Sequence, residues 1–148
     1  MVAVLAAAFA LAPPYTIQLD RLLAPTVNGH PIASERDASR LLGRPTAQTR
    51  CTARWTTLRL DTCGVGVELT ATTTAWHTAK GLHPGDTATK AHALYPQGRS
   101  LAFLHKGTLW QLETGGAMCD GGPTLALAAR LARGRVTALE VVRVPACG

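Results

Sequence analysis

Aromatic residues, serine and charge are all scarce in this 148-residue sequence, which has seven aromatic side chains, three serines and 16% charged residues. So few aromatic rings do not make the stacking platform on which proteins bind single-stranded nucleic acid. None of the serines, Ser34, Ser39 and Ser100, lies in a Gly-x-Ser-x-Gly motif, which excludes an α/β-hydrolase elbow. The sequence also lacks a run of about 18 apolar residues, so we expect no membrane-spanning helix.

Large apolar side chains are fewer than the composition suggests. Apolar residues make up 47% of the chain, but 25 of them are alanine. Several of the larger ones lie within the first twelve residues, which leaves a thin core for the rest of the chain. Small domains with thin cores are commonly stabilised by disulfide bonds, so the cysteines are candidates for this role.

The N-terminal segment 1–12 resembles a signal peptide in composition. It contains only apolar and small residues and includes two small-x-small triplets, so we predict cleavage near Ala10 or Ala12. The alternative interpretation is an N-terminal helix or strand buried in the fold. Cleavage would accompany secretion, or export to the periplasm or the exterior of the cell envelope, where disulfide bonds persist.

Four cysteines, Cys51, Cys63, Cys119 and Cys147, allow three disulfide pairings. Local spacing favours Cys51–Cys63, which closes a hairpin-sized loop, together with Cys119–Cys147. Zinc binding and free buried thiols are the alternatives, although no two cysteines have the close spacing of a zinc finger. Two disulfides would leave no thiol free for nucleophilic catalysis.

Two short helices are expected. Ser34 can cap a helix over residues 34–42, with Asp37 placed as in a capping box, and Gly43 can end it. Residues 86–95 have a capping residue at their start and an apolar stripe, and a proline follows them. Each helix is followed by sequence that favours strands.

Strands are expected in both halves of the chain. The many prolines of residues 13–27 predict an irregular lead-in. Residues from Cys51 to Leu60 favour one strand, since they are rich in threonine and include tryptophan. Residues 125–132 are ambiguous between helix and strand, but Arg133–Gly134 favours a hairpin with the strand Val136–Val144. Further strands are expected around residues 65–69, 101–103 and 109–112.

The two halves of the sequence are similar in order. A loop, a short helix and strands that contain a tryptophan precede a cysteine in residues 28–74 and again in residues 75–148. We therefore predict a single α+β domain over residues 28–148. Two short helix-plus-antiparallel-sheet repeats would form one compact, disulfide-stapled unit.

A resemblance to known proteins rests on the helix-entry segment of the second half. Residues 76–87 read Trp-His-Thr-Ala-Lys-Gly-Leu-His-Pro-Gly-Asp-Thr, and Leu94-Tyr95-Pro96 follows at the helix end. This pattern is similar to a recurrent segment of small secreted proteins from high-GC bacteria. It resembles the tandem α+β modules of β-lactamase inhibitory protein and of BamE-like outer-membrane assembly lipoproteins. The resemblance implies this fold and an extracytoplasmic location, and it implies no catalytic residue.

Catalytic, cofactor and metal sites are not predicted. The five histidines lack His-x-x-x-His spacing, and no glycine-rich segment fits a nucleotide-binding motif. Trp55 and Trp110 occupy equivalent positions in the two halves. They serve either as core anchors or as binding hot spots on a concave sheet surface, with Arg54 and Arg59 as neighbouring candidates for partner binding.

The predicted function is a secreted, non-enzymatic binding or structural module that contacts an extracellular or periplasmic protein. A net charge of +6 makes a polyanion-binding protein one alternative, but the basic residues are scattered and nucleic acid is not the expected partner. A small extracellular hydrolase with dispersed catalytic residues is the other alternative. No cofactor is expected, and the sequence does not specify an oligomeric state.

Overall fold

The computed structural model describes residues 13–20, 24–64, 66–101, 108–114 and 124–144. This part of the chain is mostly β-sheet with two short helices, α1 (Glu35–Leu42) and α2 (Ala88–Leu94). The strands are β1 (Tyr15–Leu19), β2 (Pro25–Val27), β3 (His30–Pro31), β4 (Ala47–Gln48), β5 (Thr52–Arg54), β6 (Leu58–Asp61), β7 (Glu68–Ala71), β8 (Trp76–His77), β9 (Arg99–Ser100), β10 (Thr108–Thr114), β11 (Thr124–Ala132) and β12 (Arg135–Val144). The predicted leader and the cysteines Cys119 and Cys147 lie outside the described residues.

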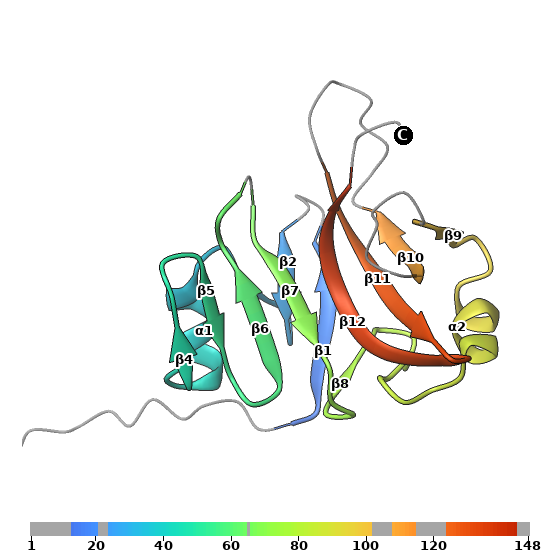
Figure 1. The fold of residues 1–148 in the computed structure, drawn as a ribbon, viewed down its shortest axis with the longest axis horizontal. Helices are drawn as coiled ribbons and strands as arrows, with labels where there is room; N and C mark the ends of the chain where they lie inside the picture. Colours follow the sequence, from blue (N-terminus) through green and yellow to red (C-terminus); the bar gives the residue numbers. More distant parts are fainter. Residues whose placement is uncertain (1–12, 21–23, 65, 102–107, 115–123, 145–148) are drawn as a thin grey trace, which may run out of the picture.

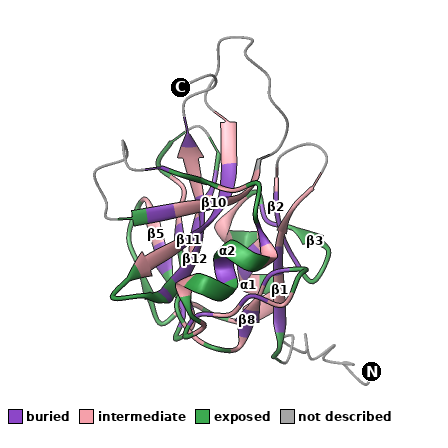
Figure 2. Ribbon diagram, turned by 90° about the vertical axis from the view of Figure 1, so that its right-hand side faces the viewer, coloured by how far each residue is buried: buried purple, intermediate pink, exposed green. Residues whose placement is uncertain are grey.

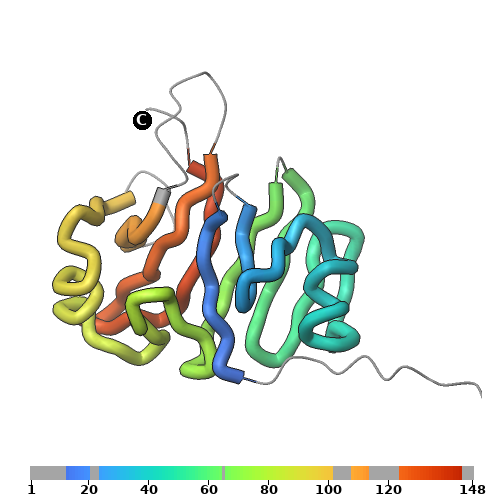
Figure 3. The backbone as a smooth tube through the Cα atoms, turned by 180° about the vertical axis from the view of Figure 1, so that it is seen from behind, coloured from blue at the N-terminus to red at the C-terminus, as the bar shows by residue number. Residues whose placement is uncertain are grey.

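The strands form two sheets. The larger sheet has the order β4-β5-β6-β7-β12-β11-β10-β9, and each neighbouring pair in it is antiparallel. The smaller sheet has the order β3-β2-β1-β8, in which β1 and β8 are parallel. Figures 1 and 3 show the smaller sheet and α1 on one side of the larger sheet.

The main core lies between these two layers. Both sheets and both helices supply buried side chains to it, including Ile17, Ala38, Leu69, Trp76 and Ala91. Strands β6 and β7 alternate between buried and more exposed residues, whereas β11 and β12 each contain four consecutive buried residues; Figure 2 colours the chain by burial. The larger sheet thus turns one apolar face toward the core. Its other face carries polar side chains on β6 and β7 and a second apolar cluster, which includes Leu109, Ala126, Ala128 and Val144.

The predicted irregular lead-in over residues 13–27 is wrong, because its described residues include the strands β1 and β2. Ile17 of β1 lies opposite Val27 of β2, and both side chains are almost fully buried. Pro25 is tolerated because it is the first residue of its strand. The apolar side chains of this segment therefore build the second layer of the core.

The single strand expected from Cys51 to Leu60 is instead a hairpin. β5 and β6 pair antiparallel around a turn at residues 56–57. Trp55 and Leu58 are both buried, and in one continuous strand they would point to opposite faces of the sheet. The reversal between them places both side chains in the core, and it determines which residues of the two strands face outward.

The predicted helices and the C-terminal hairpin are confirmed. Ser34 caps α1 by accepting the Asp37 amide, and Thr87 caps α2 in the same way. β11 and β12 pair along nearly their full length around Arg133 and Gly134, which have φ angles of 52° and 74°. Positive φ at both central positions is the signature of the type I′ turn that joins tightly twisted strands.

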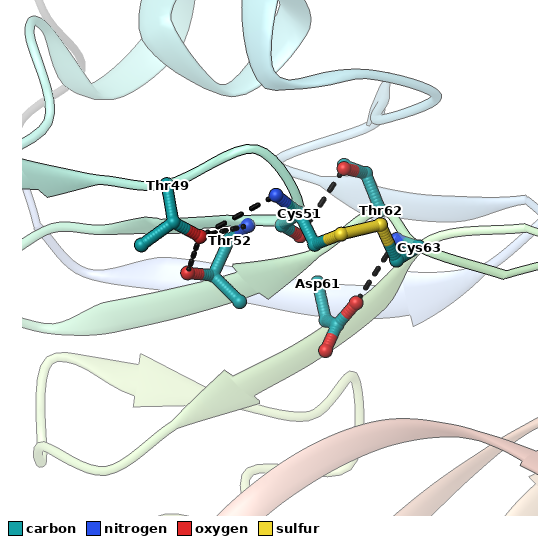
Figure 4. The surroundings of a disulfide bond; sticks show 6 residues. All are labelled: Thr49, Cys51, Thr52, Asp61, Thr62 and Cys63. Atoms are coloured by element: carbon teal, nitrogen blue, oxygen red, sulfur yellow. Dashed lines mark hydrogen bonds between the residues drawn. A yellow bond between two sulfur atoms is a disulfide. The ribbon is translucent and has the colours of Figure 1, made fainter.

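The predicted disulfide between Cys51 and Cys63 is also confirmed, and it links the ends of β5 and β6 with a Cα–Cα distance of 4.9 Å. Figure 4 shows its surroundings, where the Thr62 side chain donates to the Cys51 carbonyl at 3.2 Å. The Cys63 amide donates to the Asp61 carboxylate at 3.0 Å. The bond thus closes a hairpin whose backbone is already paired.

Element order in the larger sheet follows the order of the chain in two blocks. The helix α1 precedes β4, β5, β6 and β7, which are consecutive neighbours in the sheet. The helix α2 precedes β9, β10, β11 and β12, which are also consecutive neighbours. The blocks meet where β7 pairs with β12 over three residues of each strand, with Leu69 opposite Val141.

Candidate functional site

Polar side chains gather on the face of the larger sheet that points away from the smaller one. The register and the two-residue alternation place the following residues on this surface, which we call the outer face: Arg54, Arg59, Asp61, Glu68, Thr70, Arg130, Glu140 and Val142. A depression of about 470 Å³ lies here. Its lining is Arg59, Asp61, Glu68, Thr70, Leu109, Arg130, Glu140, Val141, Val142 and Arg143.

An ion pair between Arg130 and Glu140 lies in this depression. The Arg130 Nε donates to Glu140 Oε2 at 2.5 Å, and its Nη2 donates to Oε1 at 3.1 Å. Glu140 is only 6% exposed, whereas about a quarter of the Arg130 side chain is exposed. A bidentate pair of this kind satisfies a carboxylate that burial would otherwise penalise. The pair joins β11 to β12 in the middle of the sheet.

Two further carboxylates lie directly opposite each other on β6 and β7. Asp61 and Glu68 are cross-strand partners. Asp61 accepts the Cys63 amide at 3.0 Å, and Glu68 accepts the Arg143 amide at 3.0 Å. The guanidinium of Arg143 packs against Gly64, where a Cβ atom would overlap it. Backbone amides therefore hold both carboxylates at the edge of the depression.

Two arginines form a matching pair of like charge beside these acids. Arg54 and Arg59 are cross-strand partners on β5 and β6, and both are exposed. A second, smaller depression of about 270 Å³ adjoins them. Arg59 and Thr70 line both depressions, so the two hollows are neighbours.

The predicted partner-binding residues separate into two groups. Arg54 and Arg59 are on the outer face, as described. Trp55 is 6% exposed, belongs to the main core, and donates from its indole nitrogen to the Gly43 carbonyl at 2.8 Å. Trp110 pairs with Ala129 of the main core, and its ring contacts His92 with centroids 4.4 Å apart. Both tryptophans thus point away from the outer face.

Several residues of the outer face were missed by the sequence analysis, notably Arg130, Glu140 and Glu68. A signal was present in Glu140, which is the one acidic residue of a strand rich in valine, leucine and alanine. Arg130 lies opposite Ala138, two residues before Glu140 on the same strand, so the register of the hairpin makes the two charged residues diagonal neighbours. Glu68 alternates with buried apolar residues, which indicates an outward orientation.

A second polar cluster lies near the C-terminal end of α2. The Tyr95 hydroxyl donates to Thr78 Oγ1 at 2.6 Å, and the same oxygen accepts the Leu82 amide at 3.2 Å. Burial raises the pKa of Tyr95. Burial also raises the pKa of Glu113, although the Leu19 amide and the nearby Lys80 ammonium oppose that shift. These bonds anchor the loop before α2 to the helix end.

Metal ligands do not gather in the described part of the chain. No group of three or more histidine, cysteine, aspartate or glutamate side chains there could hold a metal ion. His77 and His83 approach each other with ring centroids 5.4 Å apart, and each bonds a backbone carbonyl through Nδ1. A search of the described helices finds none that is long and apolar enough to cross a membrane.

Comparison with protein-family models, with curated proteins and with solved structures gives no match for this chain.

Proposed function

We propose that this protein is an exported, non-enzymatic binding module that contacts a partner protein through its outer face. The observation that carries this proposal is the pair of neighbouring depressions on the larger sheet, both of which are lined by Arg59 and Thr70. Protein interfaces are enriched in arginine and include polar groups that fix the orientation of the partner. The outer face offers both.

The charges of the outer face support a protein partner over a polyanion. Arginines alternate with the acids Asp61, Glu68 and Glu140 across neighbouring strands. A nucleic acid presents a uniformly negative backbone, which these acids would repel. A folded protein surface can supply charges of both signs in matching positions.

Export is supported by the Cys51–Cys63 disulfide, since such bonds persist in oxidising compartments. The signal-like composition of residues 1–12 supports the same location. We also propose that the two blocks of helix plus four strands are tandem repeats, as in the modules of β-lactamase inhibitory protein and the BamE-like proteins. In each block a helix precedes four strands that are neighbours in the sheet, and this shared order supports that proposal.

The function is tested by blocking the centre of the outer face. Thr70→Arg introduces a long charged side chain at a residue that lines both depressions, and Thr89→Arg places the same change on the exposed surface of α2. Chemical cross-linking in the extracellular or periplasmic fraction of the source cells should give a defined adduct with the wild type and with Thr89→Arg. The adduct should disappear with Thr70→Arg, while circular dichroism remains unchanged. An adduct that survives Thr70→Arg would contradict this use of the outer face.

A further inference from the structure

Arg54 and Arg59 form a pair of like charges that the fold itself does not require. The Trp55 amide donates to the Leu58 carbonyl at 2.8 Å, so Trp55 and Leu58 are a hydrogen-bonded pair. Pairs alternate along an antiparallel ladder, and Arg54 and Arg59 are therefore a non-hydrogen-bonded pair. Side chains approach most closely in such pairs, with Cα atoms about 4.5 Å apart.

Neither guanidinium is neutralised by the described residues. All the described ion pairs involve other residues, namely Lys90 with Asp86 and Arg130 with Glu140. The hydrogen bonds of the described chain include none from the guanidinium of Arg54 or Arg59. The nearest acids by register, Asp61 and Glu68, already accept backbone amides. Directly opposed like charges destabilise a sheet, so the pair costs stability.

We propose that Arg54 and Arg59 together bind a carboxylate side chain of the partner protein. This inference rests on the proposed function and names the chemistry of its contact. Two guanidinium groups offer planar sets of N–H donors that match the oxygens of a carboxylate. Both side chains are exposed and border the second depression, so they are accessible to an incoming group.

The arrangement of charge on β6 specifies the partner further. Arg59 and Asp61 lie two residues apart on the same face of one strand, a separation of about 7 Å. Asp61 lies opposite Glu68, so these two acids form a negatively charged pair beside the positively charged pair of arginines. An extended peptide with an acidic residue and a basic residue two positions apart would place its acidic side chain at the arginine pair and its basic side chain at the pair of acids. A row of phosphates would meet repulsion at Asp61 and Glu68.

The test uses the full-length protein and short peptides. The probe is a five-residue capped peptide with Glu at position 2 and Lys at position 4 among threonines, and the control peptide has Gln in place of Glu. Nuclear magnetic resonance of the arginine Nε–H groups should show saturable shifts of Arg54 and Arg59 with the Glu peptide and none with the Gln peptide. Arg54→Gln and Arg59→Gln should each weaken binding at least fivefold. The matched control Arg36→Gln, on the exposed surface of α1, should change it less than twofold.

Stability gives an independent readout. Arg54→Gln removes the opposed like charge, so its melting temperature should rise by about 1–3 °C at low salt, and less at high salt. A melting temperature that falls would mean that Arg54 is a structural residue and would overturn the proposal.

Other outcomes separate this inference from the proposed function. Equal loss of peptide binding in Arg36→Gln would mean general attraction to the basic protein and would overturn the arginine site. Pyrophosphate that shifts Arg54 and Arg59, when the Glu peptide does not, would overturn the carboxylate assignment. A cross-linked adduct that is lost with Thr70→Arg but kept in Arg54→Gln/Arg59→Gln would leave the outer face as the interface and reject the arginine site alone.

Discussion

The Cys51–Cys63 disulfide should stabilise the protein mainly through its unfolded state. The two cysteines are separated by 12 positions in the chain. The chain-entropy estimate for a loop of this length gives a loss of about 3 kcal/mol in unfolding free energy for Cys51→Ser/Cys63→Ser. In a domain of this size the melting temperature should fall by about 6–12 °C.

The native fold should survive this change. The Thr62 amide donates to the Cys51 carbonyl at 2.8 Å, and three residue pairs connect β5 to β6 without the disulfide. Cys51 is half-buried and Cys63 is exposed, so the serine hydroxyls remain accessible to water. The variant should therefore keep the arginine Nε–H spectrum of the wild type while its urea midpoint falls.

Urea unfolding followed by tryptophan fluorescence measures this difference, with the other two cysteines unchanged in both proteins. A loss below about 1 kcal/mol would refute the loop-entropy reasoning. A variant with a changed native spectrum would also refute this reasoning. The disulfide would then determine the conformation of the native hairpin and not only its stability.

Three other predictions concern the packing and charge of the sheets. Arg130→Met should cost about 3 kcal/mol in urea unfolding because Glu140 then remains buried without a partner, whereas Arg130→Met/Glu140→Leu should be within about 1 kcal/mol of wild type. Gly98→Ala should lower the unfolding free energy by about 1–3 kcal/mol, measured by thermal melting, because its Cβ atom would overlap the indole of Trp110. Burial raises the pKa of Glu113 above its ordinary value of 4.5. The stability from this group is therefore present below that pH and is lost as the pH rises through the raised pKa, so Glu113→Gln should lose less stability over this interval in pH-dependent urea unfolding.

Local signals in the sequence were sufficient for the helices and the C-terminal hairpin. Ser34 and Thr87 cap their helices through contacts three residues away, and such contacts depend little on the rest of the fold. Arg133–Gly134 specified its turn for the same reason, since glycine tolerates positive φ. The disulfide was predictable because its cysteines are close in the chain.

The remaining errors came from contacts between distant segments. β1 is a strand because it pairs with β2 and also with β8, and Thr16 there bonds His77 across 61 positions of sequence. The turn after Trp55 was missed because threonine favours strands. The buried positions change from odd-numbered residues up to Trp55 to even-numbered residues from Leu58 onward. This change determines which side chains lie on the outer face. The sequence therefore could not show that Arg54 and Arg59 lie on the same face of the sheet.

The pairing of β12 has a consequence for how the chain folds during synthesis. Its middle residues pair with β7, and Val136 near its start exchanges backbone hydrogen bonds with Gly85 and Asp86. It is the last of the described strands to leave the ribosome, yet it lies at the centre of the larger sheet. The two blocks of strands therefore cannot join into one sheet on the ribosome until β12 has emerged. The nascent chain thus remains without its full sheet for most of translation.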